Sequence, residues 1–234
     1  MIISANTKVI SIKCHFYQTF DIFGTIIVFF REMKIFGIGR NYAAHIEELN
    51  NERPNEPVVF IMPDTALLLR NRPFYYPSFT KDIHHEVEIV VKISKAGKNI
   101  DEKFAHTYYN EIGIGIDFTA RDLQQKAKEK GLPWTIAKGF NDAAPLSKFV
   151  PKDSFDLDNL NFSLTVDGEI KQEGNTRMML FSFDYMISYL SKFFLLKKGD
   201  LIFTGTPKGV GPVNIGNRLE VFLEDKKMLH VDIK

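Results

Sequence analysis

Two glutamates separated by a single residue, Glu86 and Glu88, have the clearest capacity for chemistry in this sequence. They lie in residues 84–91, where β-branched and polar residues alternate, and this pattern predicts a β-strand. Because alternate side chains share one strand face, the two carboxylates should lie side by side. Adjacent carboxylates repel each other, so they need either water or a cation. Taken alone, the pattern is most often a solvated strand face.

A third carboxylate, Asp117, directly follows the apolar run at residues 112–116. Two glutamates on one strand and an aspartate at the end of another could form an all-oxygen cage for a hard divalent ion. A zinc site is not indicated, because the only cysteine is Cys14 and no Cys/His spacing suggests one.

Other polar residues could complete an active site. His45 and Glu48 are three residues apart on a short predicted helix, so they could touch and form a general base for water. An exposed helix pair without a role is the alternative. Lys138 is embedded among apolar neighbours, and such a lysine either reaches out to water or meets an anion. Arg121 and Gln124 could face one pocket, although a solvated helix face is commoner.

A glycine-rich loop at residues 204–211 follows a predicted strand. It lacks the order of residues and the following helix of a phosphate-binding P-loop. Its glycines are more typical of a loop that lets backbone amides approach a small anionic ligand.

The elements that must position these residues are mostly short strands. Strands are predicted at residues 34–40, 58–62, 84–93 and 112–116, and again from residue 160 to the C-terminus. An Asp167-Gly168 turn should join two of them as a hairpin. Helices are predicted at 42–49, 101–110, 119–130 and 183–194, the third ending at Gly131. Many strands and few helices indicate a β-rich α+β domain.

Composition limits the classes of function. The chain has 234 residues, 44% of them hydrophobic and 25% charged, with a formal net charge of +1. No basic run with interleaved aromatics suggests a nucleic-acid partner. The apolar stretch at residues 20–30 is too short to span a membrane and has no signal-peptide cleavage site. A reducing, cytoplasmic setting is expected. We interpret residues 1–32 as an N-terminal extension outside the native start, and 33–234 as the catalytic domain.

Together, these fragments resemble the fumarylacetoacetate hydrolase superfamily, and the smaller, single-domain, acylpyruvase-like members most. The resemblance covers residue 34 to the end and rests on these motifs: Gly39-Arg40-Asn41-Tyr42, His45-x-x-Glu48, His85-Glu86-x-Glu88, Asp117-x-Thr119-Ala120-Arg121-Asp122-x-Gln124, Lys138 and Thr204-Gly205-Thr206-Pro207-x-Gly209-Val210-Gly211.

The resemblance implies a mixed β-roll fold that forms homodimers and binds a small 2-oxo acid through Mg²⁺ or Mn²⁺. The matched metal ligands are Glu86, Glu88 and Asp117. The matched catalytic residues are His45 and Glu48, which activate water from a lid helix, and Lys138, near the substrate oxygens. The matched positions at or beside the substrate are Arg40, Arg121, Gln124 and Thr206.

The expected activity is hydrolysis of a carbon–carbon bond in an acylpyruvate, which releases pyruvate and a carboxylic acid. One alternative is decarboxylation of oxaloacetate or enol–keto tautomerisation at the same metal, and another is a non-catalytic, acid-binding dimer. The sequence departs from many relatives at Met62, where they have a lysine. Arg177 is a candidate for the compensating charge.

Overall fold

A computed structural model describes residues 17–22, 25–30, 33–48 and 52–234. The chain divides into two units, Met1–Glu32 and Met33–Lys234. In the first unit, strand β1 (Tyr17–Ile22) pairs antiparallel with β2 (Thr25–Phe30). Residues 1–16 lie outside the described part, and the interpretation of residues 1–32 as a non-native extension stays a prediction.

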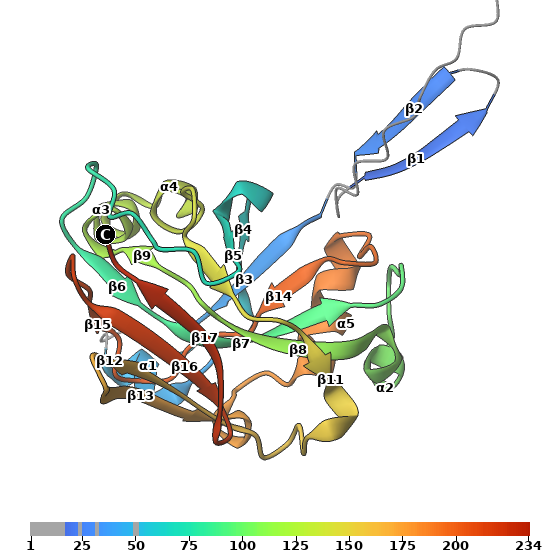
Figure 1. The fold of residues 1–234 in the computed structure, drawn as a ribbon. Helices are drawn as coiled ribbons and strands as arrows, with labels where there is room; N and C mark the ends of the chain where they lie inside the picture. The colour runs from blue at the N-terminus through green and yellow to red at the C-terminus, as the bar shows by residue number, and fades with distance from the viewer. Residues whose placement is uncertain (1–16, 23–24, 31–32, 49–51) are drawn as a thin grey trace, which may run out of the picture. The chain divides into compact units, whose positions relative to one another are not determined.

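The second unit is built on a large mixed sheet (Figure 1). Strand β14 runs parallel to β3, and β10 runs parallel to β5, whereas the other pairs in this sheet are antiparallel. In spatial order the strands are β4 (Val58–Met62), β3 (Ile35–Gly39), β14 (Leu201–Phe203), β7 (Val87–Ile93), β8 (Tyr109–Ile116), β10 (Ala144–Leu146) and β5 (Leu67–Leu69), with β11 (Val150–Pro151) also paired to β8.

Two smaller sheets complete the strand framework. One has the order β13 (Glu169–Asn175), β12 (Asn161–Val166), β16 (Arg218–Leu223) and β17 (Lys226–Asp232). The other has the order β15 (Gly211–Pro212), β6 (Ile83–His85) and β9 (Thr119–Ala120). The predicted Asp167-Gly168 hairpin is confirmed, with φ of 52° and 84° at the two turn residues, as such a two-residue turn requires.

The helices are short. They are α1 (Ala43–Glu48), α2 (Glu102–Ala105), α3 (Arg121–Lys130), α4 (Thr135–Lys138) and α5 (Phe183–Phe193), with 3₁₀ turns at Asp64–Ala66, His106–Tyr108, Lys152–Ser154 and Thr176–Met178. Helix α3 ends at Gly131 as predicted, with φ of 63°. It begins at Arg121, later than predicted, because residues 119–120 pair with β6. No helix among the described residues is long and apolar enough to cross a membrane.

Strand β7 runs through the core with its edges hydrogen-bonded to β8 and β14, and both of its faces are buried because each packs into an apolar cluster. Val87, Ile89, Val91 and Ile93 pack into the larger apolar cluster, whereas Val90 packs into a second one. The solvated strand face considered for Glu86 and Glu88 is wrong, since both residues are buried. The prediction of a β-rich α+β fold with a mixed sheet is confirmed.

Candidate metal centre and substrate cavity

The expected continuous strand through Glu86 is interrupted at that residue. Strand β6 ends at His85 and pairs with β15 and β9, whereas β7 begins at Val87 in the large sheet. At the junction the Glu86 carbonyl accepts a 2.8 Å hydrogen bond from the amide of Asp117. Because Val87 pairs with Ile116, this bond places the two acidic residues opposite each other where their strands diverge.

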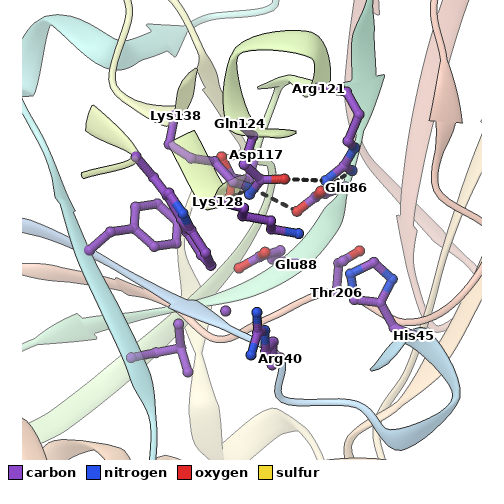
Figure 2. A pocket seen from close by; sticks show the side chains of 14 residues that line it. Arg40, His45, Glu86, Glu88, Asp117, Arg121, Gln124, Lys128, Lys138 and Thr206 are labelled. Carbon is purple, nitrogen blue, oxygen red and sulfur yellow. Dashed lines mark hydrogen bonds and ion pairs between the residues drawn. The ribbon is translucent and has the colours of Figure 1, made fainter. Parts of the chain in front are cut away.

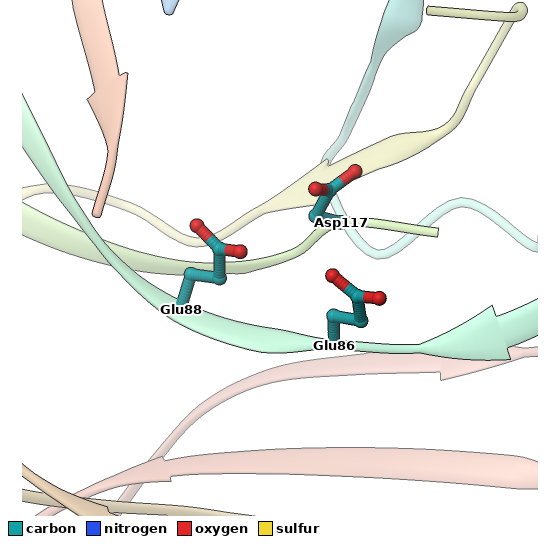
Figure 3. Close-up of side chains that lie close together, drawn as sticks. All are labelled: Glu86, Glu88 and Asp117. Carbon is teal, nitrogen blue, oxygen red and sulfur yellow. The ribbon is translucent and has the colours of Figure 1, made fainter. Parts of the chain in front are cut away.

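Glu86, Glu88 and Asp117, called here the acidic triad, converge on one point (Figure 3). One carboxylate oxygen from each lies within 4.8 Å of the other two, and none of the three residues is more than 4% exposed. The Oδ1 atom of Asp117 is buried without a hydrogen-bond partner. Buried carboxylates that close need a cation, and an unpartnered oxygen is a ready ligand, so the triad fits a hard divalent metal ion.

Two cationic side chains already contact the triad. Lys138, on α4, donates to Glu86 Oε2 at 2.8 Å and to Asp117 Oδ2 at 2.6 Å. Arg121, at the start of α3, donates to Glu86 Oε1 at 2.5 Å (Figure 2). Of the two predictions for Lys138, the second is correct: this lysine is 3% exposed and meets anions.

The three carboxyl groups differ in their affinity for protons. Burial raises the pKa of Asp117 to about 6, and burial together with the nearby Asp117 charge raises the pKa of Glu88 well above its usual range. Burial also acts on Glu86, but Lys138 and Arg121 outweigh it and hold the pKa of Glu86 well below its usual range. Glu86 is therefore a permanent anion, whereas a proton and a metal ion would compete for the other two.

The glycine-rich loop at residues 204–211 donates backbone hydrogen bonds to two carboxylates of the site. The Gly205 amide donates to Glu88 Oε2 at 2.8 Å, and Gly205 has φ of +98°, a conformation that favours glycine. The Gly209 amide donates to Glu48 Oε1 at 2.9 Å. The sequence predicted that amides of this loop approach a small anionic ligand, yet these two amides bind carboxylates of the protein itself.

His45 and Glu48 form the expected pair on α1. His45 Nδ1 lies 3.1 Å from Glu48 Oε2. Burial lowers the pKa of His45, the effect of the neighbouring Glu86 charge being smaller, so the imidazole is neutral near pH 7. A carboxylate only accepts hydrogen bonds, so Nδ1 carries the proton and Nε2 keeps its lone pair. This is the form that a general base needs.

One small cavity is lined by every predicted site residue except Glu48 (Figure 2). The Glu48 side chain is about one third exposed and contacts His45. Gln124 is held in the cavity by a 2.6 Å hydrogen bond from Arg121 to its Oε1. Arg40 has a left-handed backbone, with φ of 60°, and its buried Nε has no hydrogen-bond partner. The structure thus brings the predicted residues together, while their individual roles stay predictions.

The sequence reasoning missed Lys128, which lines the same cavity and lies with its Nζ 5.7 Å from the centre of the Trp134 ring. Its position could have revealed it, since residues 121, 124 and 128 share one face of a helix. Arg177, the candidate for a compensating charge at Met62, is not among the residues that line this cavity. It lines a separate depression beside α5.

Comparison with known proteins adds to this geometry. The family model for the C-terminal domain of fumarylacetoacetate (FAA) hydrolase matches residues 34–234. A mitochondrial oxaloacetate decarboxylase of Dictyostelium discoideum is 48% identical over 185 residues, which are 78% of this chain and 85% of the relative. The human mitochondrial oxaloacetate tautomerase FAHD1 is 45% identical over 184 residues, which are 78% of this chain and 83% of the relative.

A solved structure has a similar fold. The fumarylpyruvate hydrolase of Pseudomonas aeruginosa, crystallised in complex with Mn²⁺ and pyruvate, superposes with a TM-score of 0.83 at 33% identity, covering 97% of this chain and 99% of the other. Its bound ion and the buried acidic triad both point to a divalent metal here.

Proposed function

The chain belongs to the fumarylacetoacetate hydrolase family, and from this we propose that it is a divalent-metal-dependent enzyme acting on oxaloacetate through its enolate. The primary reaction proposed is keto–enol tautomerisation. The relatives named for oxaloacetate chemistry are 48% and 45% identical, against 33% for the fumarylpyruvate hydrolase. They therefore favour the alternative that the sequence left open over acylpyruvate hydrolysis.

The charge of the cavity is the observation that carries this proposal. Besides the acidic triad, four cationic side chains line it: Arg40, Arg121, Lys128 and Lys138. A divalent ion on the triad would leave a clear excess of positive charge. Such an excess suits a substrate with two carboxylates that gains a further negative charge as its enolate forms, and it suits a monoanionic acylpyruvate less well.

The triad would hold the metal, for which we propose Mg²⁺ or Mn²⁺ because all the donors are oxygens. When bound, such an ion supplies Lewis acidity to the 2-oxo group, a contribution of several kcal/mol. Lys138 holds two of the three carboxylates in place, and its ammonium can also stabilise an oxyanion nearby.

His45 is the proposed base. Its Nε2 would remove a proton from C3 of the keto form, with the electron pair of the C–H bond moving into the enolate. The proton then returns to the oxygen at C2, which yields the enol. Glu48 holds the imidazole by its Nδ1 proton and stabilises the imidazolium as it forms. General bases of this kind contribute roughly 10²- to 10⁴-fold to rate.

Decarboxylation can proceed at the same site without an initial proton removal. The bond between C3 and C4 breaks, carbon dioxide leaves, and the electron pair enters the enolate of pyruvate, which then takes a proton at C3. The Dictyostelium relative is named for this reaction. Since His45 is not needed to break the carbon–carbon bond, removing it should slow decarboxylation less than tautomerisation.

Acylpyruvate hydrolysis is the second candidate. The intact His45–Glu48 pair favours it, because a neutral imidazole held by a carboxylate can activate water for attack on the distal carbonyl. The likeness to the fumarylpyruvate hydrolase of Pseudomonas aeruginosa supports it as well.

We also propose that the protein acts as a homodimer, as the family resemblance implies. A cytoplasmic setting stays a prediction from the sequence, whereas the Dictyostelium and human relatives are named as mitochondrial proteins.

The test is a comparison of three reactions on the purified protein, with Mg²⁺ or Mn²⁺ and again after chelation. Loss of enol absorbance from oxaloacetate reports tautomerisation, coupled detection of pyruvate from oxaloacetate reports decarboxylation, and pyruvate from acetylpyruvate reports hydrolysis. We expect metal-dependent tautomerisation to be the fastest. The Glu86→Ala variant controls for catalysis by free metal. Rapid cleavage of acetylpyruvate with no effect on oxaloacetate would favour hydrolysis instead.

A further inference from the structure

A buried glutamine, Gln172 on β13, connects the metal centre to the glycine-rich loop. Its Oε1 accepts hydrogen bonds from His85 Nδ1 at 2.9 Å and from the Val87 amide at 3.0 Å. Its Nε2 donates to Thr206 Oγ1 at 2.8 Å and to the Pro207 carbonyl at 3.0 Å. Gln172 is 1% exposed, and its four bonds use the full capacity of the amide on both sides.

The direction of these bonds is fixed by chemistry. The Val87 amide can only donate, so the atom it meets must be the amide oxygen of Gln172. The Pro207 carbonyl can only accept, so the atom it meets must be the amide nitrogen. The nitrogen therefore donates to Thr206, whose hydroxyl oxygen acts as the acceptor.

A hydroxyl that accepts in this way still has one hydrogen to donate. In the part of the chain that the structure describes, the Thr206 hydroxyl donates to no acceptor, and the residue lines the cavity beside the acidic triad (Figure 2). We infer that Gln172 is a positioning residue that turns the Thr206 hydroxyl into a hydrogen-bond donor for a carboxylate or enolate oxygen of the bound 2-oxo acid.

The packing of the loop against β13 supports this role. Gly209 has φ of +95°, and a Cβ atom at this position would lie 2.1 Å from the carbonyl oxygen of Lys171. The loop thus lies directly against the residue that precedes Gln172, which leaves the amide and the Thr206 hydroxyl little freedom to separate.

This inference rests on the proposed function only for the class of ligand, and pyruvate serves as the probe. The measurement is calorimetric binding of pyruvate to the Mn²⁺-loaded protein, with Mn²⁺ affinity recorded for each variant. Thr206→Val removes the hydroxyl and keeps the shape, so we expect pyruvate to bind roughly 10- to 100-fold more weakly. Thr206→Ser keeps the hydroxyl and is the matched control, with affinity close to that of the wild type.

Gln172→Glu reverses the direction of the bond to Thr206 and removes the bond to the Pro207 carbonyl, because a carboxylate only accepts hydrogen bonds. A carboxylate still accepts from Val87 and His85, but its second oxygen draws the Thr206 hydrogen away from the cavity. We expect a loss of pyruvate affinity similar to that of Thr206→Val. In the Thr206→Val background, Gln172→Glu should cost no more than about a further twofold, because the hydroxyl that it redirects is already absent.

Equal losses from Gln172→Glu in both backgrounds would show a merely structural role and overturn the inference, as would unchanged affinity in Thr206→Val. If Gln172→Glu fails to fold, Gln172→Met, which has similar length and no charge, replaces it in the double-mutant cycle. It removes the amide that holds the Thr206 hydroxyl, so pyruvate affinity should fall in the wild-type background and change no more than about twofold in the Thr206→Val background. Wild-type protein that binds pyruvate but does not act on oxaloacetate would contradict the proposed function alone. Wild-type protein that binds no pyruvate would overturn both.

Discussion

Replacing Lys138 by methionine tests how the acidic triad is held together. In the wild type one ammonium group contacts two buried carboxylates, at 2.8 and 2.6 Å. Lys138→Met keeps much of the side-chain volume but removes the charge. The carboxylates then face one another, with Arg121, bound to Glu86, in partial compensation.

The loss of stability expected in Lys138→Met follows from the burial of the ammonium and carboxylate groups. Removing one partner of a buried ion pair destabilises proteins by about 3–5 kcal/mol, because a charge is left uncompensated. For a unit of about 200 residues this corresponds to a decrease of roughly 6–20 °C in melting temperature. A divalent metal on the triad would replace the missing charge. The difference in melting temperature between the variant and the wild type should therefore become smaller when Mn²⁺ is added.

The assay is thermal unfolding of both proteins at pH 8, in chelator and in excess Mn²⁺. The matched control is Lys92→Met, since Lys92 and Glu111 also lie 2.6 Å apart but their side chains are 32% and 44% exposed, and ion pairs open to solvent contribute at most about 1 kcal/mol. The amount by which the melting temperature of Lys138→Met lies below that of the wild type should decrease as the pH falls from 8 to 5. The pKa of Asp117, already raised to about 6 by burial, rises further without the lysine, so the folded variant gains a proton that relieves the repulsion.

A Lys138→Met protein that melts with the wild type in chelator would refute this reasoning. The same conclusion would follow if Mn²⁺ raised both melting temperatures equally.

Three variants of site residues and one truncation test the remaining assignments. Glu86→Ala should bind no Mn²⁺ in calorimetry and show no metal-dependent turnover; a retained tight site would place the metal elsewhere. His45→Ala should keep Mn²⁺ affinity and lose roughly 10²- to 10⁴-fold in tautomerisation rate, more than it loses in decarboxylation, and full activity would exclude it as the base. Burial, followed by the charge of Arg121, lowers the pKa of Lys128 to about 8, so the KM for oxaloacetate should rise as the pH passes above 8 and this cation is lost; Lys128→Arg should abolish the rise, and an unchanged pH profile would argue against a substrate contact. Deleting residues 1–32 should leave activity and folding intact, and a truncated protein that cannot fold would show that the segment is part of the native domain.

Much of the fold could be predicted from local patterns. The strand at Val58–Met62, the hairpin around Asp167-Gly168 and the end of α3 at Gly131 all follow from periodicity or turn chemistry, which depend on neighbouring residues alone. The apolar surroundings of Lys138 in the sequence also indicated correctly that it could be held against an anion.

Other features could not be predicted locally. The strand break at Glu86 arises because β6 and β7 find partners in different sheets, and those partners lie far away in sequence. The accepting role of Thr206 depends on Gln172, which β13 brings beside a loop more than thirty residues further along the chain. Helix periodicity places Lys128 on the same face as Arg121 and Gln124, but only the packed structure shows that this face borders the cavity.

The sequence by itself determined which acidic and basic groups the protein has, and the strand and helix segments that carry them. Only the tertiary structure decided that the carboxylate of Asp117 meets those of Glu86 and Glu88, with Lys138 between two of them. The physical reason is that secondary structure is encoded over a few residues. The meeting of charges depends on sheet order and register, which are fixed when the whole core packs and leaves these carboxylates too buried to be stable without a cation.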